Sequence, residues 1–138
     1  MARVTARIEI NEPVLERESG IILRRKHRSL TRQIATEARV RVPVLTGNLG
    51  RTIGELPQTY RPFHVDGGLE ATADYAAVVH EGSRPHRITA RRAEYLHFWW
   101  RGREVFRKSV WHPGTRPRPF LRNAMEAVVA RDPDISRV

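Results

Sequence analysis

Two short phrases in the second half of the chain decide the predicted fold: ADYAAVVHEG over residues 73–82 and VWHPGTRPRPFL over residues 110–121. In the first phrase, Asp74 is suited to cap a short helix, because its side chain can accept a bond from a backbone amide. Gly82 is suited to end that helix. The apolar residues that we expect to turn inward from it are Tyr75, Val78 and Val79.

Three prolines and a glycine restrict the backbone of the second phrase. They lower the conformational entropy of the unfolded chain and so favour a fixed loop. The loop opens a helix predicted over residues 117–131, which Asp132 and Pro133 end. The apolar side chains that this helix would carry into a core are Phe120, Leu121, Ala124 and Val128.

The first half of the chain predicts a strand followed by a long helix. Residues 3–10 alternate between apolar and polar side chains, which is the period of a half-buried strand, so residues 1–10 are assigned to an N-terminal strand. Asn11 offers a cap to a helix that Pro43 would stop, with Gly20 as a potential break. Its apolar stripe comprises Leu23, His27, Leu30, Ile34, Ala38 and Val42, and the arginines expected on the far side are Arg24, Arg28, Arg32 and Arg39.

The middle of the chain reads as short strands. Residues 54–60 and 64–71 predict two strands that Pro57, Pro62 and the Gly67–Gly68 pair interrupt, so we expect bulges or edges. An aromatic strand over residues 95–100 and a returning strand over 105–110 predict a hairpin that turns at Gly102. Together the elements predict an α+β fold: a long N-terminal helix packed on a small, mostly antiparallel sheet, with a short middle helix and a C-terminal helix.

Composition limits the classes of protein that fit. The chain has 138 residues, 40% of them hydrophobic, which predicts one domain over residues 1–138, with 134–138 frayed. No apolar run approaches the roughly 18 residues of a membrane span, and the N-terminus lacks an apolar signal segment, so we expect a soluble protein with no membrane partner. The absence of cysteine excludes disulfides, thiol catalysis and zinc–thiolate sites, in keeping with a reducing cytoplasm.

The ordered motifs at residues 46–49 (Thr-Gly-Asn-Leu), 75–82, 112–115 and 119–121 resemble the neck and tail-completion proteins that join head to tail in long-tailed bacteriophages. The resemblance covers about residues 24–129. It implies a structural virion protein, made in the cytoplasm of the bacterial host, that forms a hexameric ring through which phage DNA passes. It also implies two neighbours, a head-side connector or stopper protein and a tail terminator or tail-tube protein. The family has no catalytic residues to carry over.

Segments 83–92 and 111–118 and the aromatic hairpin are the surfaces that we expect to meet other subunits. Trp and Arg are enriched at interface hot spots. The candidate contact residues are Arg84, His86, Arg87, Trp99, Trp100, Trp111, His112, Arg116 and Arg118. The tryptophans, interleaved with basic residues, could instead form a stacking platform for single-stranded nucleic acid; we favour the interface.

The chain has a net charge of +10, and nearly all of its positive charge comes from arginine. This charge suggests DNA binding as a second candidate function, because contacts to phosphates dominate such binding. Arg24, Arg28 and Arg32 repeat every fourth residue, so they could face phosphates along one side of the long helix. No groove-reading motif accompanies them. A solvated face, or one that meets an acidic partner, explains the same pattern.

Enzymatic and metal-binding functions have little support. His80, His86, His97 and His112 have irregular spacing, and no HExxH pattern occurs. Neither Ser83 nor Ser109 lies in a nucleophile elbow, nothing selects Glu81 and Glu94 as an acid–base pair, and no phosphate-binding loop is present. We therefore expect a protein that is not an enzyme and needs no metal or cofactor.

Overall fold

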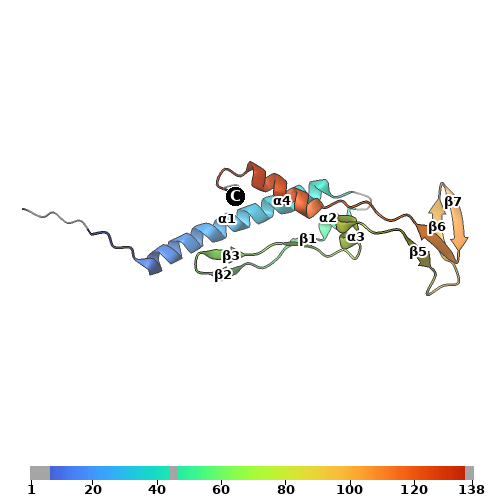
Figure 1. Cartoon of the computed structure of the whole chain (residues 1–138), viewed down its shortest axis with the longest axis horizontal. Helices are drawn as coiled ribbons and strands as arrows, with labels where there is room; N and C mark the ends of the chain where they lie inside the picture. Colours follow the sequence, from blue (N-terminus) through green and yellow to red (C-terminus); the bar gives the residue numbers. More distant parts are fainter. Residues whose placement is uncertain (1–6, 44–46, 136–138) are drawn as a thin grey trace, which may run out of the picture. The chain divides into compact units, whose positions relative to one another are not determined.

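A computed structural model describes residues 7–43 and 47–135 and has an α+β fold of helices and small antiparallel sheets (Figure 1). The chain divides into two compact units. Unit 1 contains the residues up to Ala73 and those from Phe120 onward, and unit 2 contains residues 74–119. The assignment of all 138 residues to one domain stays a prediction.

Unit 1 is built on a single long helix, α1 (Glu12–Arg41). Asn11 caps it, since its Oδ1 accepts a hydrogen bond from the Val14 amide at 3.2 Å. The helix ends at Val42, whose N–H donates to the Ala38 carbonyl at 3.1 Å. Both predicted ends are confirmed. Gly20 does not break the helix, because a cost of about 1 kcal/mol for glycine is small beside the packing of a 30-residue helix.

The predicted N-terminal strand is wrong for residues 7–10, which have no strand structure. Ile8 and Ile10 are 90% and 68% exposed, so the alternating pattern buries nothing there. An alternating segment becomes a strand only where a neighbouring strand and a core accept it, and nothing described lies against these residues in that way. Residues 1–6, the rest of the predicted strand, lie outside the described residues.

The core of unit 1 lies where α1 packs against α4 (Phe120–Arg131). The predicted α1 stripe faces inward, and the small side chains of Ala38, which belongs to the stripe, and of Ala35, which was not predicted, are buried. From α4, Phe120, Ala124 and Val128 are buried as predicted. The predicted start of α4 at residue 117 is wrong. Arg116 and Arg118 each precede a proline, and that position disfavours helical backbone.

Two ladders of unit 1 form one irregular antiparallel hairpin. The outer ladder pairs β1 (Ile53–Glu55) with β4 (Leu69–Ala71), and the inner one pairs β2 (Thr59–Arg61) with β3 (His64–Asp66). Between the two ladders, residues 56–58 lie opposite residues 67–68, so one strand carries an extra residue. This bulge contains Pro57 and the Gly67–Gly68 pair and confirms the predicted interruption.

One side of α1 faces this hairpin. Arg39 Nη2 donates to the Ile53 carbonyl of β1 at 2.8 Å, so Arg39 does not lie on the far side of the helix as predicted. The short helix α2 (Asn48–Arg51) follows Gly47, whose φ of 74° glycine adopts readily, and it buries Leu49 in the same core.

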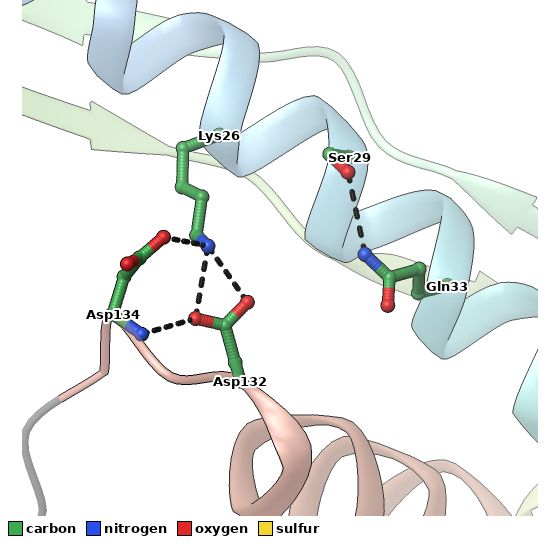
Figure 2. Close-up of polar contacts among 5 residues, drawn as sticks. All are labelled: Lys26, Ser29, Gln33, Asp132 and Asp134. Atoms are coloured by element: carbon green, nitrogen blue, oxygen red, sulfur yellow. Dashed lines mark hydrogen bonds and ion pairs between the residues drawn. The ribbon is translucent and has the colours of Figure 1, made fainter.

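Ion pairs tie the C-terminal end of α4 to α1 (Figure 2). Lys26 Nζ donates to both carboxylate oxygens of Asp132, at 2.9 and 2.7 Å, and to Asp134 Oδ2 at 2.8 Å. The hydrogen bond from Lys26 lowers the pKa of Asp132 and, reciprocally, raises the pKa of Lys26. Hydrogen bonds from Arg131 and Arg41 likewise lower the pKa of Glu37. The pairs of Lys26 with Asp132 and Asp134 and of Glu37 with Arg131 join segments about 100 residues apart in sequence, whereas the Glu37–Arg41 pair lies within α1.

We predict that Phe120→Ala lowers the free energy of unfolding by about 3–5 kcal/mol, because Phe120 is 2% exposed and its loss leaves a cavity. Met125→Ala is the control: it removes a side chain of the same helix that is 48% exposed and should change stability far less. Urea unfolding of both variants measures the difference. Equal stabilities would mean that Phe120 is not in the core.

We predict that Asp132→Asn lowers stability at neutral pH and weakens the dependence of stability on acid. A carboxyl group with a depressed folded pKa contributes stability above its unfolded pKa of about 3.9, and this contribution is lost as the pH falls through the folded value. Thermal unfolding between neutral pH and the acid range below the unfolded pKa measures it. Glu126→Gln, an exposed change in α4, is the control. The same acid dependence in all three proteins would contradict the role of the Lys26 pair.

Candidate functional site

Unit 2 begins with α3 (Ala76–Glu81), which starts later than predicted. Its N-cap is Tyr75 with no side-chain bond, so Asp74 is not the cap; residues 74 and 75 form a turn. A helix of six residues has one short buried face, here Ala76 followed by the half-buried Val79. Tyr75 and Val78 are 42% and 43% exposed, which corrects their predicted inward position. Gly82 ends the helix, as predicted, with φ 76°.

The two phrases that decide the predicted fold meet directly in unit 2. Ser83 N–H donates to the Thr115 carbonyl at 3.0 Å, and Thr115 N–H donates back to the Ser83 carbonyl at 3.0 Å. Ser83 Oγ accepts from the same Thr115 amide at 3.0 Å. Arg118 N–H donates to the Val79 carbonyl at 2.9 Å. We call this set of bonds the 83–115 clamp.

Two glycines make the clamp possible. A Cβ at Gly82 would lie 2.6 Å from the Thr115 carbonyl oxygen, and a Cβ at Gly114 would collide with the Ser83 carbonyl oxygen. Both glycines also have positive φ, 76° and 91°, which side chains disfavour. Each phrase therefore supplies a glycine that admits the backbone of the other.

Beyond the clamp, β5 (His86–Thr89) pairs with β8 (Ser109–His112). The predicted returning strand over 105–110 is divided, because its last residues belong to this second ladder. The register places His86 opposite His112, with ring centroids 5.1 Å apart, and Arg87 opposite Trp111. Sequence reasoning missed this pairing, although Ile88 between the polar residues Arg87 and Thr89 is consistent with a half-buried strand.

The predicted aromatic hairpin is confirmed as β6 (Leu96–Trp100) and β7 (Arg103–Arg107), inserted between β5 and β8. Its two turn residues, Arg101 and Gly102, have φ of 49° and 75°, as a type I′ turn requires, and this turn matches the strand twist. Residues 91–95 form a bend between the two ladders. On one face His97 stacks on Phe106, with centroids 4.6 Å apart.

Most of the large aromatic side chains of unit 2 are exposed, although Phe98 is half-buried. Trp99 and Trp100 are 68% and 62% exposed, on opposite faces of the hairpin, and Trp111 and Phe106 are 67% and 52% exposed. Ala76 is the one buried residue in unit 2. Exposed apolar area of this kind marks interaction surfaces.

The nine candidate contact residues all lie in unit 2, and the structure brings four of them together as cross-strand pairs: His86 with His112 and Arg87 with Trp111. Trp99 and Trp100 stay apart from these on the β6–β7 hairpin. Arg84, Arg116 and Arg118 are exposed at the clamp. The candidate residues therefore lie on several faces of unit 2 rather than in a single pocket.

The candidate phosphate-facing residues lie in unit 1. Arg24, Arg28 and Arg32 are exposed along α1, as predicted. The Arg24 guanidinium lies 5.0 Å from the centre of the Tyr60 ring of β2, and its Nε donates to the Gly20 carbonyl at 3.1 Å.

Of the four candidate histidines, only His86 and His112 lie together, across the β5–β8 ladder. His97 contacts Glu104 at 2.6 Å, and His80 contacts Glu81 at 2.6 Å. His112 Nδ1 accepts from the Gly114 amide, and His86 Nδ1 lies 2.8 Å from the Arg84 carbonyl, to which it must donate. Within residues 7–43 and 47–135, no group of three or more His, Asp or Glu side chains is placed to hold a metal ion.

No protein-family model matches the sequence, and neither the curated proteins nor the solved structures give a significant match. Among the described helices, none is both long and apolar enough to cross a bilayer.

We predict that Gly114→Ala destabilises unit 2 more than Gly102→Ala does. Both changes place a side chain at positive φ, a cost of about 1–2 kcal/mol, but only the first also forces a Cβ against the Ser83 carbonyl. Nothing lies within 4 Å of a Cβ at Gly102. Amide hydrogen exchange of residues 83 and 115 measures the effect. Equal protection in the two variants would contradict the clamp.

Proposed function

We propose that this chain is a structural protein of the phage neck that joins the head to the tail. The observation that carries the proposal is the 83–115 clamp. The motif phrases around Gly82 and Gly114 lie far apart in sequence, yet each contains the glycine that the other needs. The phrases by which the chain resembles neck proteins therefore lie together in the fold, and this contact supports the proposal.

The mechanism that we propose is the formation of interfaces by preshaped surfaces. Glycine and proline hold the loop over residues 112–119 before any partner arrives, so less entropy is lost on docking. A ring of identical subunits needs two different, matching patches on each chain. We assign one patch to the β6–β7 hairpin with Trp99 and Trp100, and the other to Arg87 and Trp111 with the loop that carries Arg116 and Arg118.

In this proposal the subunits form a hexameric ring in the virion, at the junction of head and tail, after synthesis in the bacterial cytoplasm. Its neighbours are a head-side connector or stopper protein and a tail terminator or tail-tube protein. Phage DNA passes through the ring without sequence-specific contacts.

We predict that inactivating the gene in the phage that encodes this chain leaves DNA-filled heads and tails unjoined, and that adding the purified protein to such lysates restores whole particles. The double change Trp99→Ser/Trp100→Ser should remain folded and fail to restore joining, because the two indoles are exposed. Electron microscopy and plaque counts measure the outcome.

The control variant is Val40→Ser, which changes an apolar side chain of α1 that is 78% exposed in unit 1 and should join particles normally. Joined, infectious particles without the protein would overturn the proposed function. Full activity of the double tryptophan variant would show that the subunit contact does not involve the hairpin.

DNA binding through α1 is the second candidate function. It rests on the exposure of Arg24, Arg28 and Arg32 in one row. If the row bound duplex DNA, removing its three charges would reduce the salt dependence of log affinity by about 2.7, at roughly 0.9 per phosphate contact. We expect instead that duplex binding is weak and nearly unchanged when all three arginines are replaced by glutamine.

A further inference from the structure

Two adjoining hollows lie along α1 within unit 1, beside the β2–β3 hairpin. The larger has a volume of about 660 Å³ and is lined by Arg24, Arg25, Arg28, Arg32, Ile21 and Tyr60, among others. The second, of about 480 Å³, shares Arg24 and Tyr60 and extends past Gly20 to Pro13 and Phe63. Together they form one groove between α1 and the β2–β3 hairpin, which we call the α1 groove.

The larger hollow is rich in positive charge, and the carboxylates nearest to it, Glu16 and Glu55, line neighbouring hollows that share Arg24 and Arg28 with it. No carboxylate lines it, and none of its four arginines pairs with a carboxylate of the described residues. Elsewhere in unit 1, Lys26, Arg41 and Arg61 each have an acidic partner. Like charges four residues apart on a helix repel, so an unpaired arginine row costs stability in the free chain. A ligand with negative charges would remove that cost.

The groove is also preorganised. Arg24 is held between the Tyr60 ring, 5.0 Å from the ring centre, and the Gly20 carbonyl. The Tyr60 hydroxyl donates to Gln58 Oε1 at 2.8 Å, which fixes the wall of the groove. Along α1, Arg24, Arg28 and Arg32 rise by about 6 Å per step. Glutamates four residues apart on a partner helix rise by the same distance, so their spacing fits this row.

The apolar walls favour a protein over a nucleic acid. Ile21 and Phe63 are 40% and 54% exposed beside the arginines, and a phosphate backbone offers nothing to cover them. A base stacking on Tyr60 would compete with the Arg24 guanidinium for a ring face. An amphipathic helix supplies carboxylates and apolar side chains together.

We propose that the α1 groove binds an acidic amphipathic helix of a partner protein. Its carboxylates contact Arg24, Arg28 and Arg32, and its apolar side chains cover Ile21, Tyr60 and Phe63. This interaction goes beyond the head–tail role and does not depend on it, because it is a property of unit 1 that is measured on the purified chain.

The experiment is fluorescence anisotropy with the full chain and a labelled helical peptide of about five turns that carries glutamate at every fourth position and leucine on the adjoining positions. We expect the triple change Arg24→Gln/Arg28→Gln/Arg32→Gln to weaken peptide binding about tenfold or more. The charge-matched control Arg91→Gln/Arg92→Gln/Arg122→Gln, at exposed positions outside the groove, should change it by about twofold at most.

Ile21→Gln separates the two classes of ligand, because it leaves the charge unchanged. It should weaken peptide binding and leave binding of an oligothymidine probe and of a DNA duplex as it was. Circular dichroism confirms that each variant keeps its helices. Three results would each overturn the proposal. The first is an equal loss of peptide binding in the two triple variants, and the second is unchanged peptide binding in Ile21→Gln. The third is nucleic-acid binding that is tighter than peptide binding and is lost when the three groove arginines are replaced.

Discussion

Mutual backbone hydrogen bonds between Ser83 and Thr115, 32 residues apart in sequence, hold the two ends of unit 2 together. Both ladders, β5–β8 and β6–β7, lie between these ends, so the clamp closes the loop from which they extend. The entropy of closing such a loop must be offset locally, because unit 2 has little buried apolar area. The prolines of the second phrase offset part of this entropy, because they restrict the backbone of the unfolded chain. Gly82 and Gly114 allow the two backbones to approach closely enough to form the hydrogen bonds.

The two units obtain stability in different ways. Unit 1 contains nearly all the buried side chains, with Phe120 and Val128 of α4 packed against α1, and ion pairs from Lys26 and Arg131 add links at its edge. Unit 2 places most of its aromatic residues on the surface, and an isolated two-stranded hairpin is only marginally stable in water. This contrast supports the proposal that the exposed aromatic residues of unit 2 form contacts between subunits.

Local signals predicted much of this fold. The Asn11 cap, the stop before Pro43, the stripe from Phe120 to Val128 and the Gly102 turn are all set by neighbouring residues, and each is confirmed. The incorrect predictions concern segments whose structure depends on residues far away in the sequence or on the proline steps before α4. The alternation before Asn11 has no neighbouring strand, the α4 start is delayed by successive X–Pro steps, and β5–β8 pairing depends on a register that joins residues 86 and 112.

In the candidate sites, too, the sequence predicts local properties and does not predict contacts between distant segments. The exposure of the arginine row and of the tryptophans could be anticipated from composition and spacing. The groove that Arg24 forms with Tyr60 could not, because it depends on how the β2–β3 hairpin lies against α1. The pairing of Arg87 with Trp111 likewise depends on strand register, which the sequence pattern leaves open.

Hydrogen exchange resolved by mass spectrometry, on the free chain and on the chain within joined phage particles, tests most directly whether the 83–115 clamp forms before assembly and whether assembly then covers the β6–β7 hairpin. We predict that the amides of Ser83 and Thr115 are protected in both states, because the clamp exists before assembly. Amides of β6 and β7 should exchange fast in the free chain and slowly in the particle. Fast exchange at the clamp in the free chain, or fast exchange of the hairpin in both states, would contradict this account.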